Sequence, residues 1–256
     1  MRRIWAGVVL MLAVVAPAAA QPAALETILL PVHIAGAPLQ GANGSRWTTD
    51  LAIHNAGPAE VILGPCGVPS PLPSACPPSY FSVLAGETLR NHAVGFTDAG
   101  VNGRLLHVRA ELASQLAFSL RVRDLARAAE DDGTELPVVR GEAFRTGTVR
   151  LIDVPLAPTS RVLLRVYDLD DRGDGQVRVR VISDDGAIAD HPLLIAASGY
   201  GHPGGLPFAP GYGALPLEGS GNVRVEIEPI TPGLRLWAFA TVTNNATQHV
   251  TVVSPQ

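Results

Sequence analysis

The chain has 256 residues and a formal net charge of −4 at pH 7, and all 19 of its basic residues are arginine. These arginines form no basic cluster that could serve as a footprint for phosphates, which argues against a nucleic acid as the partner. Glycine and proline are frequent, with 26 and 22 residues, and only 5% of the residues are aromatic. This composition is typical of many short strands joined by turns and predicts an all-β protein.

Residues 1–20 have the three parts of a secretory signal peptide. Arg2 and Arg3 precede an apolar core that runs from Trp5 to Val15, and the alanines at 18–20 precede Gln21. The apolar run of roughly a dozen residues is shorter than the ~20 that a membrane-spanning helix needs. We therefore favour a cleaved leader over the alternative, a membrane anchor. We expect a secreted or periplasmic protein with no membrane span after cleavage.

The first notable feature of the mature chain is its pair of cysteines. Cys66 and Cys76 flank a proline-dense loop. In an oxidising compartment two cysteines this close are expected to form a disulfide, which would stabilise the fold by about 2–3 kcal/mol in the chain-entropy model. Metal binding is the weaker alternative, because no histidine lies nearby in the sequence.

Alternation of apolar and polar residues predicts strands in both halves of the chain. In the first half the apolar positions are Trp47, Leu51 and Ile53, and later Leu116, Phe118, Leu120 and Val122; in the second half they are Val177, Val179 and Val181, and later Val223, Val225 and Ile227. One buried and one solvated face per strand is typical of antiparallel sheets. Residues 111–129 could instead form an amphipathic helix, but we favour a strand to about Asp124 and then a turn of helix.

The two halves also resemble each other. Ser45-Arg46 opens a predicted strand in the first half, as Ser160-Arg161 does in the second, and the segment at Leu116 resembles the one at Trp237. These matches favour two copies of one β-sandwich domain over a single large domain or a chance likeness. A polar break at residues 126–134 separates the copies. We place β-sandwich domain 1 at residues 21–130 and domain 2 at residues 131–256.

Two segments carry a resemblance to a known group of proteins. Gly41 to Asn55, with the sequence GANGSRWTTDLAIHN, and Ala238 to Thr247, with the sequence AFATVTNNAT, resemble uncharacterised exported bacterial proteins with tandem immunoglobulin-like β-sandwich domains. The resemblance implies the fold and an exported location. It implies no activity and transfers no functional residues.

The acidic turn at residues 168–175 is a candidate calcium site. Its carboxylates are Asp168, Asp170, Asp171 and Asp174, the ligand type that calcium prefers. The spacing departs from the calcium-loop pattern, because Arg172 stands where a third carboxylate is expected. The turn also lies between two predicted strands, where a hairpin needs Asp and Gly for its turn. Calcium is the one cofactor that the sequence suggests, as the weaker of these two interpretations.

The stretch from Ser198 to Gly221 is the second candidate site. It is rich in glycine and proline and carries Tyr200, His202, Phe208 and Tyr212. Long loops of this kind often carry function, and exposed aromatic rings can stack on sugars or contact a protein. The alternative, which we favour, is that these rings cap the core of the second domain.

The sequence contains no motif typical of a hydrolase, such as Gly-x-Ser-x-Gly or His-Glu-x-x-His. We therefore expect a secreted, non-catalytic binding or structural protein of the cell envelope or exterior, with an envelope polysaccharide or protein as its partner. The first alternative is an extracellular hydrolase with its site in the Ser198 to Gly221 loop. The second is a calcium-stabilised adhesion module.

Overall fold

The structure is a computed structural model, and it describes residues 24–34, 36–64, 80–91, 103–127, 132–170, 174–196 and 210–256. The predicted leader and both cysteines of the predicted disulfide, Cys66 and Cys76, lie outside the described residues. Every strand pairing in the described ranges is antiparallel, so the all-β, antiparallel class is confirmed. No helix in these ranges is long and apolar enough to cross a membrane.

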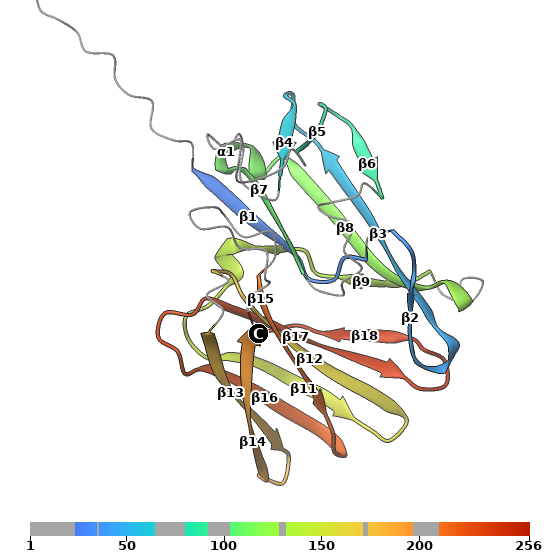
Figure 1. The fold of residues 1–256 in the computed structure, drawn as a ribbon, viewed down its shortest axis with the longest axis vertical. Coiled ribbons are helices and arrows are strands. Elements are labelled where there is room, and N and C mark those ends of the chain that lie inside the picture. Colours follow the sequence, from blue (N-terminus) through green and yellow to red (C-terminus); the bar gives the residue numbers. More distant parts are fainter. Residues whose placement is uncertain are drawn as a thin grey trace, which may run out of the picture.

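The first half of the chain forms three small sheets, which we call the N-terminal lobe (Figure 1). In one of them β1 (Leu25–Leu30) lies between β10 (Val139–Arg140) and β7 (Arg104–Arg109). A second has the order β2 (Leu39–Gln40), β3 (Arg46–Asn55), β8 (Leu116–Asp124) and β9 (Thr134–Leu136), with β6 (Thr88–Arg90) also paired to β3. The third pairs β4 (Val61–Leu63) with β5 (Phe81–Val83).

Short helical segments join some of these strands. They are η1 (Ala42–Gly44), α1 (Ala110–Ala113), η2 (Leu125–Arg127) and η3 (Gly141–Ala143). The prediction of a strand that ends at Asp124 and is followed by a turn of helix is confirmed by β8 and η2. The alternative of a long helix over residues 111–129 is wrong.

The second half forms one eight-stranded sheet, which we call the C-terminal lobe. Its strand order is β11 (Val149–Leu156), β16 (Gly221–Pro229), β13 (Asp174–Ser183), β14 (Ile188–Ala196), β15 (Gly211–Leu217), β12 (Ser160–Asp168), β17 (Leu236–Asn244) and β18 (Val250–Val253). The first strand, β11, contacts β17 and β18 at the other end, so the sheet is nearly closed and barrel-like. Its weakest pairing joins β14 and β15 at one position, Ala196 opposite Tyr212. Two separate sandwich domains remain a prediction.

The predicted alternation is visible in the burial of the strands. On β13 and β16, Val177, Val179, Val225 and Ile227 are all fully buried, and the arginine and glutamate positions between them are not. The segments that resemble each other between the halves also have equivalent partners: β3 pairs with β8, and β12 pairs with β17. The register differs, because Trp47 lies opposite Asp124 whereas its counterpart Val162 lies opposite Val242, and not opposite Asn245, the position that matches Asp124.

A shared hydrophobic core joins the lobes. One cluster of buried residues fills the inside of the C-terminal sheet, and the other, in the N-terminal lobe, also contains Tyr167, Trp237 and Phe239 from β12 and β17. The ring of Tyr167 stacks at 6.3 Å from that of Phe239, and its hydroxyl donates a hydrogen bond of 2.5 Å to the carbonyl of Pro31. The N-terminal lobe therefore covers the outer face of these two strands.

The segment between the lobes belongs structurally to the first. Strands β9 and β10 follow residue 130, where the sequence predicts a boundary, yet they pair with β8 and β1, which precede it. The last part of the N-terminal lobe is therefore made by residues 134–140.

Candidate functional site

Of the four predicted binding residues, only Tyr212 is described. It lies on β15 opposite Tyr167 of β12, and the two ring centroids are 5.4 Å apart. The ring is half-buried and packs against the shared core. Tyr200, His202 and Phe208 lie outside the described residues, as do residues 198–209 of the loop that would hold the alternative hydrolase site. The prediction of a loop is wrong for the rest of the stretch, because residues 211–217 form β15. Their role in binding stays a prediction.

Two of the four predicted calcium ligands are described with their side chains. Asp168 is 1% exposed, and one of its carboxylate oxygens accepts a hydrogen bond from the backbone N–H of Asp170. Asp170 forms an ion pair with Arg235, in which the arginine Nε donates a hydrogen bond of 3.0 Å to the carboxylate. This hydrogen bond raises the pKa of Arg235. The carboxylate of Asp170 is therefore neutralised within the fold.

Asp171 and the side chain of Asp174 lie outside the described part. Among the residues that are described, no group of three or more His, Cys, Asp or Glu side chains could hold a metal ion. Calcium binding stays a prediction for this turn. The alternative of a hairpin turn is wrong, because β12 pairs with β15 and β17 whereas β13 pairs with β14 and β16.

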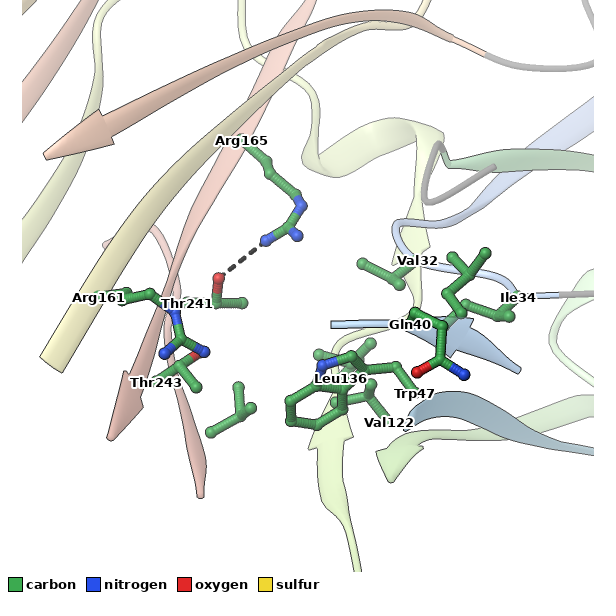
Figure 2. Close-up of a pocket in the computed structure, with 12 residues that line it drawn as sticks. Val32, Ile34, Gln40, Trp47, Val122, Leu136, Arg161, Arg165, Thr241 and Thr243 are labelled. Carbon is green, nitrogen blue, oxygen red and sulfur yellow. Dashed lines mark hydrogen bonds between the residues drawn. The ribbon is translucent and has the colours of Figure 1, made fainter. Parts of the chain in front are cut away.

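The site that combines most features of a ligand pocket lies between the two lobes, and we call it the inter-lobe pocket. Its volume is about 220 Å³. One wall carries Arg161 and Arg165 of β12 with Thr241 and Thr243 of β17, and the facing wall is mainly apolar (Figure 2). The other residues that line it are Val32, Ile34, Leu39, Gln40, Trp47, Val122, Leu136 and Val250.

Strand geometry places these side chains in the pocket. Successive residues of a strand point to opposite faces, so Val162, Leu164 and Val166 fill the C-terminal core whereas Arg161 and Arg165 point outward. The facing wall comes from β2, β3, β8 and β9 and from the residues that follow β1. The pocket therefore forms where the outer face of one sheet meets the face of another.

Hydrogen bonds join the two lobes beside the pocket. The Thr134 hydroxyl donates to the carbonyl of Val250 at 2.5 Å, which joins β9 to β18 beside the pocket. On η1, the Asn43 side-chain amide donates to the carbonyl of Asn245 at 3.2 Å. The pocket is therefore built into the contact between the lobes.

Within the part of the chain that the structure describes, the two arginines in the pocket donate hydrogen bonds only to neutral groups. Arg161 donates through Nη1 to the Oδ1 atom of Asn245 at 2.7 Å and through Nη2 to the Oε1 atom of Gln248 at 2.8 Å. Arg165 donates through Nη1 to the Thr241 hydroxyl at 2.8 Å, the dashed line in Figure 2.

The Arg165 guanidinium also lies 5.7 Å from the ring centroid of Phe239, a cation–π contact. Its Nε is buried and has no hydrogen-bond partner among the described residues. In the same ranges, no carboxylate lies within 4.0 Å of either guanidinium group in the pocket. Two positive charges without a counter-ion thus face a mainly apolar wall.

A second, larger hollow of about 680 Å³ follows the segment that joins the lobes. It is lined by residues 137–140, 142–143 and 145–149, by Trp237 and by residues 254–256. Arg140 is paired with Glu26 at 2.6 Å, and Arg145 is exposed to solvent. Its positive charges are therefore already paired or hydrated, which makes it a weaker candidate than the inter-lobe pocket.

Sequence reasoning missed the inter-lobe pocket. Arg161, Arg165, Thr241 and Thr243 alternate with core residues, and this pattern predicts a solvated strand face. The only sequence signal was the likeness between the strand at Ser45 and the strand at Ser160, because those two strands contribute Trp47 and both arginines. Comparison of the chain with models of known protein families, with curated proteins and with solved structures found no match.

Proposed function

We propose that this chain is a secreted or periplasmic, non-catalytic binding protein of the cell envelope or exterior, and that the inter-lobe pocket holds its ligand. The observation that carries the proposal is the pocket itself: a small apolar cavity with a few convergent polar groups is the usual form of a ligand site. The proposal keeps the exported location and the tandem immunoglobulin-like domains that the resemblance implies. Its partner is an envelope polysaccharide or protein, or a small molecule attached to or released from one.

The chemistry of the pocket favours binding over catalysis. General acid–base catalysis needs a side chain whose pKa lies near the working pH, most often histidine or a carboxyl group. The described lining consists of aliphatic residues, Trp47, Gln40, two threonines and two arginines. Arginine stays protonated at ordinary pH and so serves to hold an anion or an acceptor.

The first test is the binding of a small neutral apolar dye, 1-naphthylamine, whose emission shifts in an apolar site. We expect saturable binding of one dye per chain. The Val122→Phe variant should weaken it at least tenfold, because the added ring occupies the pocket. Ile188→Phe is the matched control, since Ile188 is 62% exposed on β14 and lies outside the lining. Equal affinity of a folded Val122→Phe variant would place the dye elsewhere and remove the basis of the proposal.

The envelope part of the proposal needs its own test. We expect the protein to be retained by the envelope fraction of its own cells or by an insoluble polysaccharide. Retention should fall in the Val122→Phe variant and persist in Ile188→Phe. Retention that both variants keep would assign the contact to another surface.

A further inference from the structure

We infer that the inter-lobe pocket binds a small amphiphilic carboxylate, with its acyl chain against the apolar wall and its carboxylate against Arg165 and Arg161. This inference rests on the proposed function, because it assumes that the pocket is a ligand site. It adds the chemical class of the ligand. Three observations carry it: the absence of counter-ions, the unused donors and the size of the cavity.

The first observation is that the half-buried arginines outside the pocket each contact a carboxylate. Six arginines in the described ranges are half-buried: Arg123, Arg127, Arg140, Arg161, Arg165 and Arg180. Four of them contact a carboxylate: Arg123 with Asp50 at 2.8 Å, Arg127 with Asp124 at 2.6 Å, Arg140 with Glu26 at 2.6 Å and Arg180 with Glu228 at 3.1 Å.

The two half-buried arginines without a carboxylate both line the inter-lobe pocket. A charge that is partly removed from water and has no opposite charge beside it is unfavourable, and a ligand anion that accepts its hydrogen bonds offsets part of that cost. The distribution of the carboxylates therefore favours an anionic ligand over a neutral or cationic one.

The second observation is that Arg165 has guanidinium donors without a partner among the described residues. A guanidinium group has five N–H donors in a planar fork that matches a carboxylate. Arg165 uses only Nη1 among the described residues, to the Thr241 hydroxyl. Figure 2 shows its guanidinium group directed toward the space between the two walls. The donors of Nη2 are therefore available to a carboxylate placed there.

The shape of the pocket makes the third point. The wall opposite the arginines carries Trp47, Val122 and Leu136, with Val32 and Ile34 beside them (Figure 2). Its volume of about 220 Å³ holds roughly seven groups of the size of a water molecule, at ~30 Å³ each. An acyl chain of hexanoate or octanoate length fits this space, whereas a long-chain lipid exceeds it. A charged head on one side and an apolar wall on the other define an amphiphile.

The test compares three ligands of one chain length: octanoate, 1-octanol and octylammonium. Each is titrated into the protein against the bound naphthylamine dye at neutral pH and low salt. We expect octanoate to displace the dye at a concentration at least tenfold lower than 1-octanol, and octylammonium to be the weakest. Because exposed and half-exposed charges are screened by salt, the advantage of octanoate over 1-octanol should shrink at 1 M NaCl.

Two variants locate the anion. Arg165→Gln and Arg161→Gln should each lose at least threefold in octanoate affinity while the affinity for 1-octanol and for the dye is kept. The second variant keeps the test valid if the first fails to fold. Arg178→Gln is the control, because Arg178 lies on the exposed face of β13 and outside the pocket. It should leave all three affinities unchanged.

The outcomes separate this inference from the proposed function. If the dye and 1-octanol bind as well as octanoate, and both glutamine variants bind octanoate normally, the pocket is a neutral apolar site and the inference is wrong. If neither the dye nor any of the three ligands binds, the proposed function fails as well.

Discussion

The hydroxyl of Tyr167 offers a direct measure of how strongly the two lobes are coupled. The side chain is fully buried, and its hydroxyl donates to the carbonyl of Pro31 in the N-terminal lobe at 2.5 Å. Burial raises the pKa of Tyr167 far above its ordinary value, so the hydroxyl remains a donor at every working pH. The Tyr167→Phe variant removes only this oxygen and leaves the contacts with Phe239 and Trp237 in place.

The expected cost follows from the state of the acceptor. Without the hydroxyl, the Pro31 carbonyl stays buried and loses this partner, which costs about 1–3 kcal/mol of unfolding free energy. Urea unfolding can be followed by the fluorescence of Trp47 on β3 and Trp237 on β17, so the signal reports on both lobes. The ring centroid of Trp237 lies 6.0 Å from that of Tyr167. We expect a lower midpoint, an unchanged slope and a single transition, since the shared core makes the lobes unfold together.

Tyr212→Phe is the matched control. Its ring contacts the same tyrosine, but its hydroxyl has no hydrogen bond to another described residue, so we expect a change within about 0.5 kcal/mol. If Tyr167→Phe costs no more than Tyr212→Phe, the hydrogen bond between the lobes adds nothing to stability. Two separate transitions in the unmodified protein would contradict the shared core.

Three further predictions use the same urea measurement. Burial, and then the nearby charge of Arg104, lower the pKa of His33 from 6.5 to about 4, so the unfolded chain takes up a proton before the folded one does. Stability should therefore fall as the pH drops from about 6.5 toward 4, by about 3 kcal/mol in total, and His33→Phe should flatten this profile. Burial alone would raise the pKa of Asp124, but hydrogen bonds, among them one from Arg127, outweigh burial and lower the pKa. The ionised carboxylate of Asp124 therefore stabilises the folded protein above pH ~4, and this contribution is lost in stronger acid. Asp124→Asn should cost about 1–3 kcal/mol at pH 7 and less at pH 3, and a cost that does not change with pH would contradict the assignment. Leu164→Ala, in the middle of the C-terminal core, should cost about 2–5 kcal/mol, whereas a loss below 1 kcal/mol would mean that the sheet interior is loosely packed.

Local patterns in the sequence were sufficient for the strand class and for several strands. The alternation at Val177 to Val181 and at Val223 to Ile227 predicted β13 and β16, which pair with each other in the C-terminal sheet. The end of β8 at Asp124 was also predictable, because the alternation stops there. These features depend on neighbours in the sequence, which is why they could be read from it.

Contacts between the lobes could not be predicted in the same way. Alternation predicts one solvated face for each strand, but β12 and β17 are covered on both faces where Tyr167, Trp237 and Phe239 meet the N-terminal lobe. The same contact forms the inter-lobe pocket, and it depends on how two sheets pack rather than on any local pattern. The nearly closed shape of the eight-stranded sheet also depends on pairings between segments that are distant in the sequence, such as β11 with β16.

The shared core also constrains the order in which the chain can mature. Strand β1 pairs with β10, and the core cluster that contains Ile28 also contains Trp237 and Phe239, near the other end of the chain. Because the chain is synthesised from its N-terminus, the apolar side chains that pack around Phe239 stay exposed until β17 and β18 have been made. Pairings across such long separations form slowly and leave apolar surface open to aggregation in the meantime. An incomplete chain that ends before β17 should therefore need a chaperone, whereas the complete chain can cover this surface with its own strands.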